Sequence, residues 1–284
     1  MGNVSDAMKK HQAEQAAKAA AGGPEPAPAE DAAQPEPTPE PQRRHRHSRV
    51  ILNGYSPKLV AHHKRGSPLA EEYRELRTSL LAQYKDERFC LLVTSAKPEE
   101  GKTVTCLNLG IVLAERQEYR TAVVDCDLRW RKGKKGKKGK IASLLRSEQG
   151  PGMADLLRGT ATLEDVLQPT SYPNLLVVPA GQAETEEVGE LLAKQELEEI
   201  VGQLRRDFDH VLLDTPPVNV VSDAGIIGRA VREALLVVRM YGTDRESVDE
   251  AIRLLHSANV KPVGVILTHH QKSRTRYSRY GGYS

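Results

Sequence analysis

The sequence predicts an α/β fold in which a mostly parallel β-sheet is sandwiched between helices. Two observations support this prediction. Apolar runs of strand length alternate along the chain with longer stretches whose apolar residues recur at helical spacing. The apolar runs also lack the polar alternation of a half-exposed strand, which is typical of parallel strands covered by helices on both faces.

The expected elements follow from these patterns in chain order. A first helix is expected to start at Ser67-Pro68 and to run to about Gln83. Strands are then expected at residues 89–94, 121–124, 175–179, 210–213, 234–238 and 262–267. Helices are expected at residues 103–116, 187–206, 222–232 and 244–257. Ligands of such sheets bind at the carboxyl ends of the strands, so a site is sought there.

The flanking regions have a different composition. Residues 1–49 are rich in Ala, Pro, Glu and Gln, which predicts a disordered tail that ends in a basic cluster. The folded domain is expected at 50–271 and a tyrosine-containing tail at 272–284. The balance of 41 Lys and Arg against 38 Asp and Glu gives no reason to expect specific nucleic-acid binding. Three cysteines without metal-type spacing, and the lack of an apolar run long enough to span a membrane, predict a cytoplasmic protein.

One loop has the composition of a phosphate-binding loop. Residues 96–103 read AKPEEGKT, follow the first strand and open the next helix. In such a loop the backbone N–H groups hold phosphate oxygens, Lys102 reaches the β and γ phosphates, and the Thr103 hydroxyl ligates magnesium. We expect the carboxylates of Glu99 and Glu100 to point to solvent, because they would repel a polyanion. The predicted nucleotide-binding residues are Ala96, Lys97, Pro98, Glu99, Glu100, Gly101, Lys102, Thr103 and Val104.

Acidic residues stand at the ends of two further strands. Asp125 and Asp127 are two apart, so in an extended segment both side chains lie on one face, toward the phosphate loop. Asp214 ends an apolar strand just before two prolines, as the acid of a Walker B motif does. Carboxylates at these positions can hold Mg²⁺ and accept a proton from an attacking hydroxyl. We therefore predict ATP and Mg²⁺ as cofactors.

At these residues the chain resembles the bacterial tyrosine kinases that regulate capsule and exopolysaccharide synthesis. The shared patterns are three apolar residues followed by D-x-D-x-R at 122–129, E-x-x-R-x-x-R at 71–77, and tyrosines near the end. The resemblance covers about residues 67–284. It implies a P-loop fold, with Asp125 as the base for the tyrosine hydroxyl. The implied catalytic residues are Lys102, Asp125 and Asp127, and the implied magnesium ligands are Thr103, Asp127 and Asp214.

The resemblance also points to assembly through helix 67–84. Glu71, Arg74 and Arg77 are three apart and share one face of this helix, a spacing suited to ion pairs between subunits. Ion pairs within the helix itself, on a solvated face, are the alternative. Family members without a membrane segment depend on a separate transmembrane adaptor. The resemblance therefore implies an adaptor of polysaccharide export as a partner and a location at the inner face of the plasma membrane.

The tail offers the expected substrate. Tyr277, Tyr280 and Tyr283 lie within seven residues and are interleaved with Gly, Ser and Arg, which do not build a core. We expect them to be autophosphorylation sites, modified in trans because a tail that leaves the far end of a sheet reaches a neighbouring subunit more easily than its own site.

Two features leave alternatives open. Residues 129–140 read RWRKGKKGKKGK and predict a cationic loop that would gather acidic substrates, touch an anionic surface or be a solvated insertion. Lys97 matches the extra lysine of partition and division ATPases, so a switch ATPase with nucleotide-driven dimerisation and no kinase activity is the alternative function. Iron–sulphur carriers of the same superfamily are excluded because the chain has no C-x-x-C pair.

Overall fold

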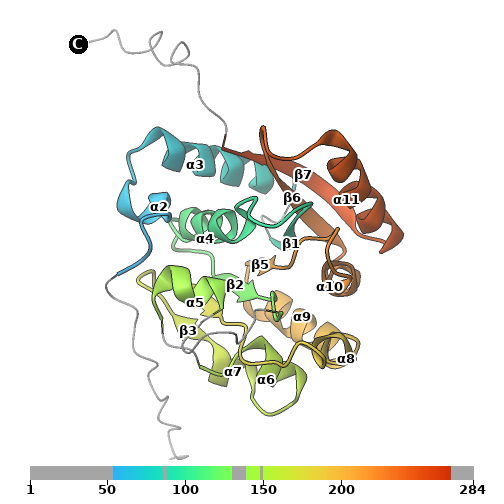
Figure 1. Cartoon of the computed structure of the whole chain (residues 1–284). Helices are drawn as coiled ribbons and strands as arrows, with labels where there is room; N and C mark the ends of the chain where they lie inside the picture. Colours follow the sequence, from blue (N-terminus) through green and yellow to red (C-terminus); the bar gives the residue numbers. More distant parts are fainter. Residues whose placement is uncertain (1–53, 86–87, 130–138, 148–149, 270–284) are drawn as a thin grey trace, which may run out of the picture. The chain divides into compact units, whose positions relative to one another are not determined.

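The computed structural model describes residues 54–85, 88–129, 139–147 and 150–269. Within these residues, seven strands form one sheet in the order β3-β4-β2-β5-β1-β6-β7, with every pairing parallel except that of β3 with β4 (Figure 1). The strands are β1 (Phe89–Ser95), β2 (Thr121–Asp125), β3 (Gln168–Pro169), β4 (Leu175–Val178), β5 (His210–Asp214), β6 (Glu233–Arg239) and β7 (Lys261–Thr268). The predicted fold class is confirmed.

The helices separate these strands as expected, with additions. They are α2 (Val60–His63), α3 (Pro68–Leu81), α4 (Lys102–Leu113), α5 (Lys140–Leu145), α6 (Met153–Leu157), α7 (Leu163–Val166), α8 (Val188–Leu192), α9 (Glu196–Asp207), α10 (Asp223–Val231) and α11 (Arg245–Ser257). The helix predicted over 187–206 is two helices, α8 and α9. The shortest elements, among them α2 and α5, had no clear periodic signal in the sequence.

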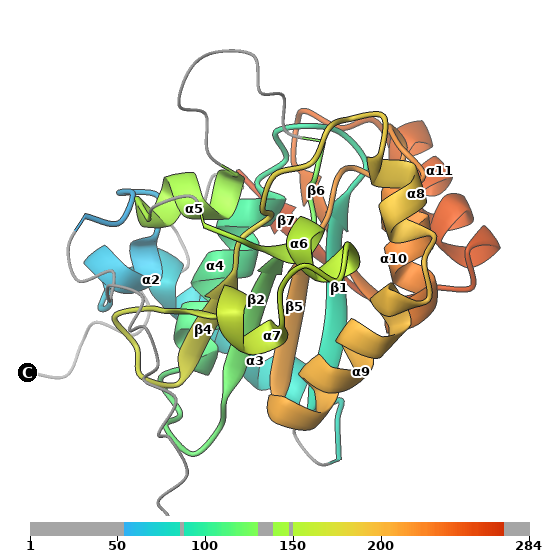
Figure 2. The same ribbon diagram turned by 90° about the horizontal axis from the view of Figure 1, so that it is seen from below.

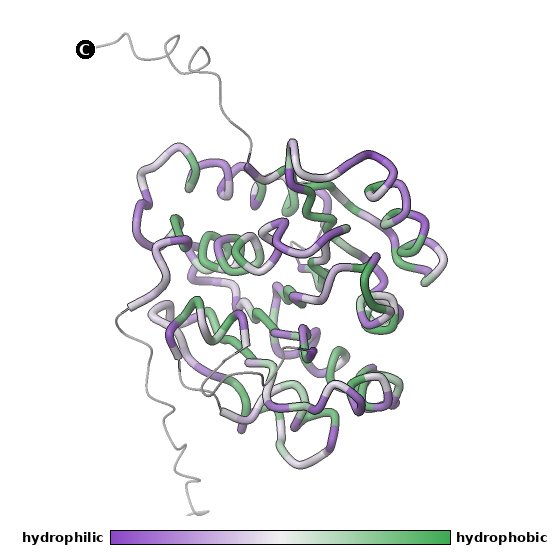
Figure 3. Tube along the Cα trace, viewed as in Figure 1, coloured by the Kyte–Doolittle hydropathy of each residue, from purple (hydrophilic) through white to green (hydrophobic). Residues whose placement is uncertain are grey.

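Helices cover the sheet on both faces. One apolar cluster joins alternate strand residues to α2, α3, α4 and α5, and the other joins the remaining strand residues to α6 through α11. Figure 2 shows α2, α4 and α5 on one side of the strands and α8 to α11 on the other. The strands and α4 are apolar in Figure 3, whereas α3 and α11 carry many hydrophilic residues. β1, β2 and β5 are therefore buried along their whole length.

The strand order decides which residues meet at the site. β5 lies between β1 and β2, with Asp214 beside Val93 on one side and beside Asp125 on the other. The carboxyl ends of these three strands therefore bring the phosphate loop and the two acidic motifs to one edge of the sheet.

The last strand ends at that same edge. β7 is the edge strand of the sheet, but it runs parallel to β6 and β1. Thr268, at its carboxyl end, therefore lies at the same end of the strands as the phosphate loop that follows β1. The expectation that the tail leaves the domain far from its own site is therefore wrong. All parallel strands, including the outermost one, have their carboxyl ends on the same side of the sheet.

Some predictions concern segments outside the described residues. These are the tail at 1–49, the basic segment 130–138 within the predicted 129–140 loop, and the tyrosine-containing tail at 272–284. In the part of the chain that the structure describes, no helix has the length and apolar character needed to cross a membrane.

Candidate active site

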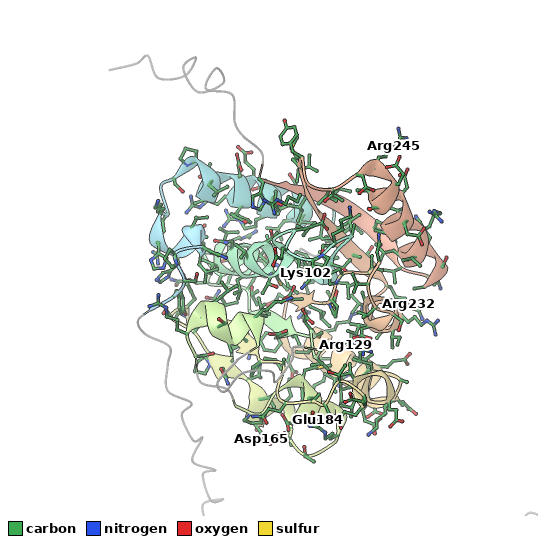
Figure 4. The ribbon with its side chains drawn as sticks, in the orientation of Figure 1. Lys102, Arg129, Asp165, Glu184, Arg232 and Arg245 are labelled. Atoms are coloured by element: carbon green, nitrogen blue, oxygen red, sulfur yellow. The ribbon has the colours of Figure 1, made fainter. Side chains whose placement is uncertain are left out.

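The phosphate loop connects β1 to α4. Gly101 has a φ of +93°, a left-handed conformation that glycine adopts without strain, and it turns the chain into α4. Lys102 and Thr103 begin the helix and are only 4% and 6% exposed. Figure 4 shows Lys102 in the middle of the molecule, at the start of α4. The loop thus has the strand-to-helix context that a phosphate-binding loop needs.

Glu100 does not point to solvent, so that expectation is wrong for this residue. Its side chain is 2% exposed and accepts hydrogen bonds from the backbone N–H of Lys97 at 2.8 Å and from the hydroxyl of Thr243. Its backbone carbonyl accepts a hydrogen bond from the Thr268 hydroxyl at 2.7 Å. These donors compensate for burial of the carboxylate, which instead fastens the phosphate loop to the β6–α11 loop and to the end of β7. Glu99 is exposed, as expected.

Lys97 has a partner within the chain. Its ammonium group forms an ion pair with Asp244, the residue that caps the start of α11. The lysine side chain is 41% exposed. In this arrangement Lys97 contacts the β6–α11 loop rather than the three carboxylates at the strand ends.

The three predicted carboxylates surround Lys102. Its Nζ lies 3.4 Å from an oxygen of Asp127 and 3.4 Å from an oxygen of Asp214. Asp125 is fully buried, and its two oxygens accept hydrogen bonds from the N–H groups of Asp127 and Ile141, both at 3.2 Å. The structure therefore brings together the predicted catalytic residues Lys102, Asp125 and Asp127 with the predicted metal ligand Asp214.

Burial and mutual repulsion set the charge of this group. Burial, with the nearby charges of Asp214 and Asp127, raises the pKa of Asp125 to about 7. Burial also raises the pKa of Asp214. For Asp127 the attraction of Lys102 and of Lys140 outweighs burial and lowers the pKa. Burial alone would lower the pKa of Lys102, but the carboxylates around it raise the pKa. One of the carboxylates, Asp125, can therefore exchange a proton near neutral pH.

The oxygen atoms at this edge fit a magnesium ion. Oδ2 of Asp214 is buried without a hydrogen-bond partner, and the Thr103 hydroxyl lies close enough to this carboxylate to lower its pKa. Hard oxygen atoms are the ligands that Mg²⁺ prefers, and it usually takes others from phosphates and water. Among the described residues, no group of three His, Cys, Asp or Glu side chains is arranged to hold a metal unaided. A ligand set of Thr103, Asp127 and Asp214 would thus be completed by the nucleotide.

Two contacts of the D-x-D-x-R segment were missing from the sequence prediction. Arg129 forms two hydrogen bonds with Asp223, at 2.6 and 2.9 Å, and this aspartate is fully buried at the start of α10. Lys140, at the start of α5, places its Nζ 2.6 Å from Oδ2 of Asp127. Asp223 belongs to no recognisable motif, and Lys140 was predicted only as the last residue of the cationic loop 129–140, whereas it begins α5.

The residues predicted to form a subunit interface have partners within the chain. Arg74 binds Glu115 at 2.7 Å and Glu71 at 3.0 Å, while Arg77 binds Glu115 at 3.0 Å and the carbonyl of Val112 at 2.6 Å. These contacts join α3 to the end of α4. The two guanidinium groups are therefore paired with carboxylates of the same chain, and the interface between subunits remains a prediction.

The comparisons with known proteins agree with this geometry. A sequence profile described as the CobQ/CobB/MinD/ParA nucleotide binding domain matches residues 91–279. The solved structure of the VpsO kinase domain is 30% identical to this chain and superposes with a TM-score of 0.60. The match covers 72% of this chain and 100% of the VpsO domain. The chain belongs to this nucleotide-binding family.

Relatives named as bacterial tyrosine kinases place the chain on the tyrosine kinase branch of this family. The tyrosine-protein kinase Wzc of Salmonella typhimurium is 31% identical over 214 residues, which are 75% of this chain and 28% of Wzc. The putative tyrosine-protein kinase CapB of Staphylococcus aureus is 29% identical, covering 78% of this chain and 95% of CapB. The kinase domain of the Escherichia coli tyrosine kinase ETK has a TM-score of 0.69 at 29% identity, over 76% of this chain and 82% of that domain. The chain spans just over a quarter of the length of the Salmonella relatives.

Proposed function

We propose that the protein is an ATP-dependent protein-tyrosine autokinase that regulates the synthesis and export of exopolysaccharide or capsule. One observation supports this most strongly. A buried carboxylate with a pKa of about 7, Asp125, lies in the same cluster as the phosphate-loop lysine Lys102. Phosphoryl transfer to a tyrosine hydroxyl needs such a proton acceptor beside the phosphate loop, and the similarity to kinases named above favours tyrosine over water as the attacking group.

Each side chain has a proposed role. Lys102 holds the β and γ phosphates, and Asp125 accepts the proton of the tyrosine hydroxyl. Thr103, Asp127 and Asp214 hold Mg²⁺, which would neutralise charge on the phosphates when bound. The hydrogen bonds of Glu100 with Lys97, Thr243 and Thr268, called the Glu100 clamp below, keep the loop from Ala96 to Val104 in place.

Substrate and partners follow from the family. The proposed substrates are Tyr277, Tyr280 and Tyr283 of a neighbouring subunit, and a separate transmembrane adaptor would hold the protein at the inner face of the plasma membrane. The chain shares its fold with the chimerical protein CapA2B2, at 24% identity and a TM-score of 0.68.

A switch ATPase is the second candidate, because the matching profile also includes MinD and ParA and because Lys97 matches the extra lysine of such ATPases. The ion pair of Lys97 with Asp244 favours the kinase, since it gives the lysine a local partner.

The deciding experiment is incubation of the purified full chain with ATP and Mg²⁺, followed by mass spectrometry. Phosphotyrosine is expected in the wild type and not in Lys102→Ala. Release of ADP with nucleotide-dependent dimerisation but without phosphotyrosine would support the switch ATPase instead.

A further inference from the structure

Three consecutive residues of one segment contact the D-x-D carboxylates. Lys140 forms an ion pair with Asp127, and the N–H of Ile141 donates to Asp125. Gly139 allows this close approach, since a Cβ atom at its position would lie 3.0 Å from Oδ2 of Asp125. The segment is therefore part of the wall of the site, although it follows the D-x-D pair by more than ten residues.

The ammonium groups of two lysines share one oxygen atom. Lys102 and Lys140 both contact Oδ2 of Asp127, at 3.4 and 2.6 Å, so their Nζ atoms are at most about 6 Å apart. Lys102 is buried, whereas the Lys140 side chain is 54% exposed and approaches from the open side. The ammonium group of Lys102 thus reaches this oxygen of Asp127 from the protein interior, and that of Lys140 reaches it from the solvent-exposed side.

Binding of magnesium would change this arrangement. A carboxylate that ligates Mg²⁺ cannot keep two ammonium groups on the same oxygen, because the cations repel one another. The phosphate-loop pattern gives Lys102 a new partner in the β and γ phosphates. Lys140, whose side chain is 54% exposed, is then free to turn to another anion near Asp127, and the terminal phosphate is the anion that the proposed function brings there.

We propose that Lys140 is a catalytic residue that contacts the γ-phosphate of ATP, an assignment that rests on the proposed kinase function. In the nucleotide-free protein it neutralises Asp127, and with nucleotide bound it moves to the transferring group. There it stabilises the negative charge that is spread over the phosphate oxygens during transfer.

A chemical probe tests the contact without relying on activity. In an acyl-phosphate derivative of ATP the acyl group is attached to the γ-phosphate. A nearby lysine amine attacks the acyl carbon, an amide forms, and the nucleotide leaves as free ATP. We expect the probe to label Lys102 and Lys140 of the full wild-type chain in the presence of Mg²⁺, with excess ADP suppressing both. Acylation blocks tryptic cleavage at Lys140, so the diagnostic peptide spans residues 139–146.

The outcomes separate this inference from the nucleotide site itself. Labelling of Lys102 without Lys140 would overturn the inference and leave the nucleotide site supported. Labelling of Lys140 that ADP does not suppress would also overturn it, because this would reflect general exposure. Absence of label at both lysines would refute the phosphate site and the inference together.

Kinetics with matched variants test the catalytic role. Lys140→Met is expected to lower kcat for tyrosine phosphorylation at least 30-fold, while the Kd for ADP changes less than threefold. Lys140→Arg should recover most of the rate because it keeps the charge. Lys261→Met, which removes an exposed lysine at the amino end of β7, should keep the wild-type kcat. An unchanged kcat in Lys140→Met, or an equal loss in Lys140→Arg, would contradict the assignment.

Discussion

At the scale of single residues, Asp125 combines two properties that a proton acceptor needs. It is shielded from bulk water, and its two oxygen atoms are held by the N–H groups of Asp127 and Ile141. Burial and neighbouring carboxylates keep its pKa near neutrality, where a base is most effective. The orientation of the carboxylate is therefore fixed before a substrate arrives.

Replacement of this residue gives the first prediction. Asp125→Asn keeps the size of the side chain but removes the base, so the rate of tyrosine phosphorylation should fall by about 10²- to 10⁴-fold. Nucleotide affinity should stay within about threefold, since Lys102 still reaches the phosphates. Steady-state phosphotransfer and titration with a fluorescent ADP measure the two effects. Near-normal transfer in this variant would remove Asp125 from the mechanism.

Some site residues could be identified from short sequence motifs, whereas others depend on contacts between distant parts of the chain. Lys102 and Asp214 could be predicted because a short motif fixes their spacing from a strand end. Glu100 was predicted as a loop residue, but its burial depends on Thr243, more than 140 positions away. Lys140 was predicted as part of the cationic loop 129–140 but without its partner, and Asp223 was missed, because the partners of both come from other parts of the chain. Pairing between distant segments leaves no periodic signal in a single sequence.

At the scale of elements, the clamp around Glu100 links the phosphate loop to the loop before α11. Thr243→Val keeps the shape of the side chain but removes the hydroxyl donor from a buried carboxylate. We expect nucleotide binding to weaken about 5- to 10-fold, equivalent to about 1 to 1.4 kcal/mol. Thr243→Ser keeps the hydroxyl and should bind like the wild type. Equal ADP affinity of the two variants in calorimetry would show that the clamp does not position the loop.

The contact between α3 and α4 predicts a dependence of stability on pH. Burial alone would raise the pKa of Glu115, but Arg74 and Arg77 outweigh it and lower the pKa below 4.5. A group with a lowered pKa in the folded state stabilises the protein above its unfolded pKa, and this stabilisation is lost as the pH falls through the folded value. The difference in unfolding free energy between wild type and Glu115→Gln should thus shrink between about pH 5 and about pH 3. Urea denaturation across this range measures it, and a constant difference would contradict the ion-pair explanation.

The elements themselves were predictable where the pattern was long. α11 was expected at 244–257 and lies at 245–257, and the six predicted strands were placed within one residue at each end, whereas the two-residue strand β3 was not predicted. The region around α8 and α9 was expected to be one helix because its apolar spacing continues through the break. α2 has only four residues and α5 has six, too few to repeat a helical period. Strand order could not be predicted either, since it depends on contacts between whole elements.

At the scale of the whole molecule, Arg74 and Arg77 of α3 are predicted to hold subunits together. Arg74→Ala combined with Arg77→Ala should reduce the oligomer mass in light scattering and lower phosphorylation between subunits. Glu115→Gln serves as the control, because it removes the partner within the chain but keeps both guanidinium groups. It should keep the oligomer mass. Equal mass of wild type and double variant would refute the interface, and equal loss in Glu115→Gln would indicate a folding defect instead.

The accessibility of the chain's tyrosines predicts which of them the kinase phosphorylates. Tyr55 is 3% exposed, and Tyr84 donates a hydrogen bond to Glu233 at 2.9 Å, so these folded positions are poor substrates. We expect a tail-deleted active chain to phosphorylate Tyr277, Tyr280 and Tyr283 of a full-length Lys102→Ala chain, with peptide mapping as the measurement. Each phosphate adds about −1.5 to −2 charges, which should favour release from an acidic site. Labelling confined to core tyrosines would refute this selection.

The hydrogen bond between Thr268 and the carbonyl of Glu100 has a consequence for competition between substrates. Tyr277 follows Thr268 by nine residues, so no path of the chain takes it more than about 30 Å from the phosphate loop. One group confined to a sphere of that radius has an effective concentration on the order of 10 mM. A tyrosine of another molecule therefore competes with the chain's own tail at this concentration, so efficient phosphorylation between subunits requires an assembly that holds the neighbour's tail at a similar local concentration.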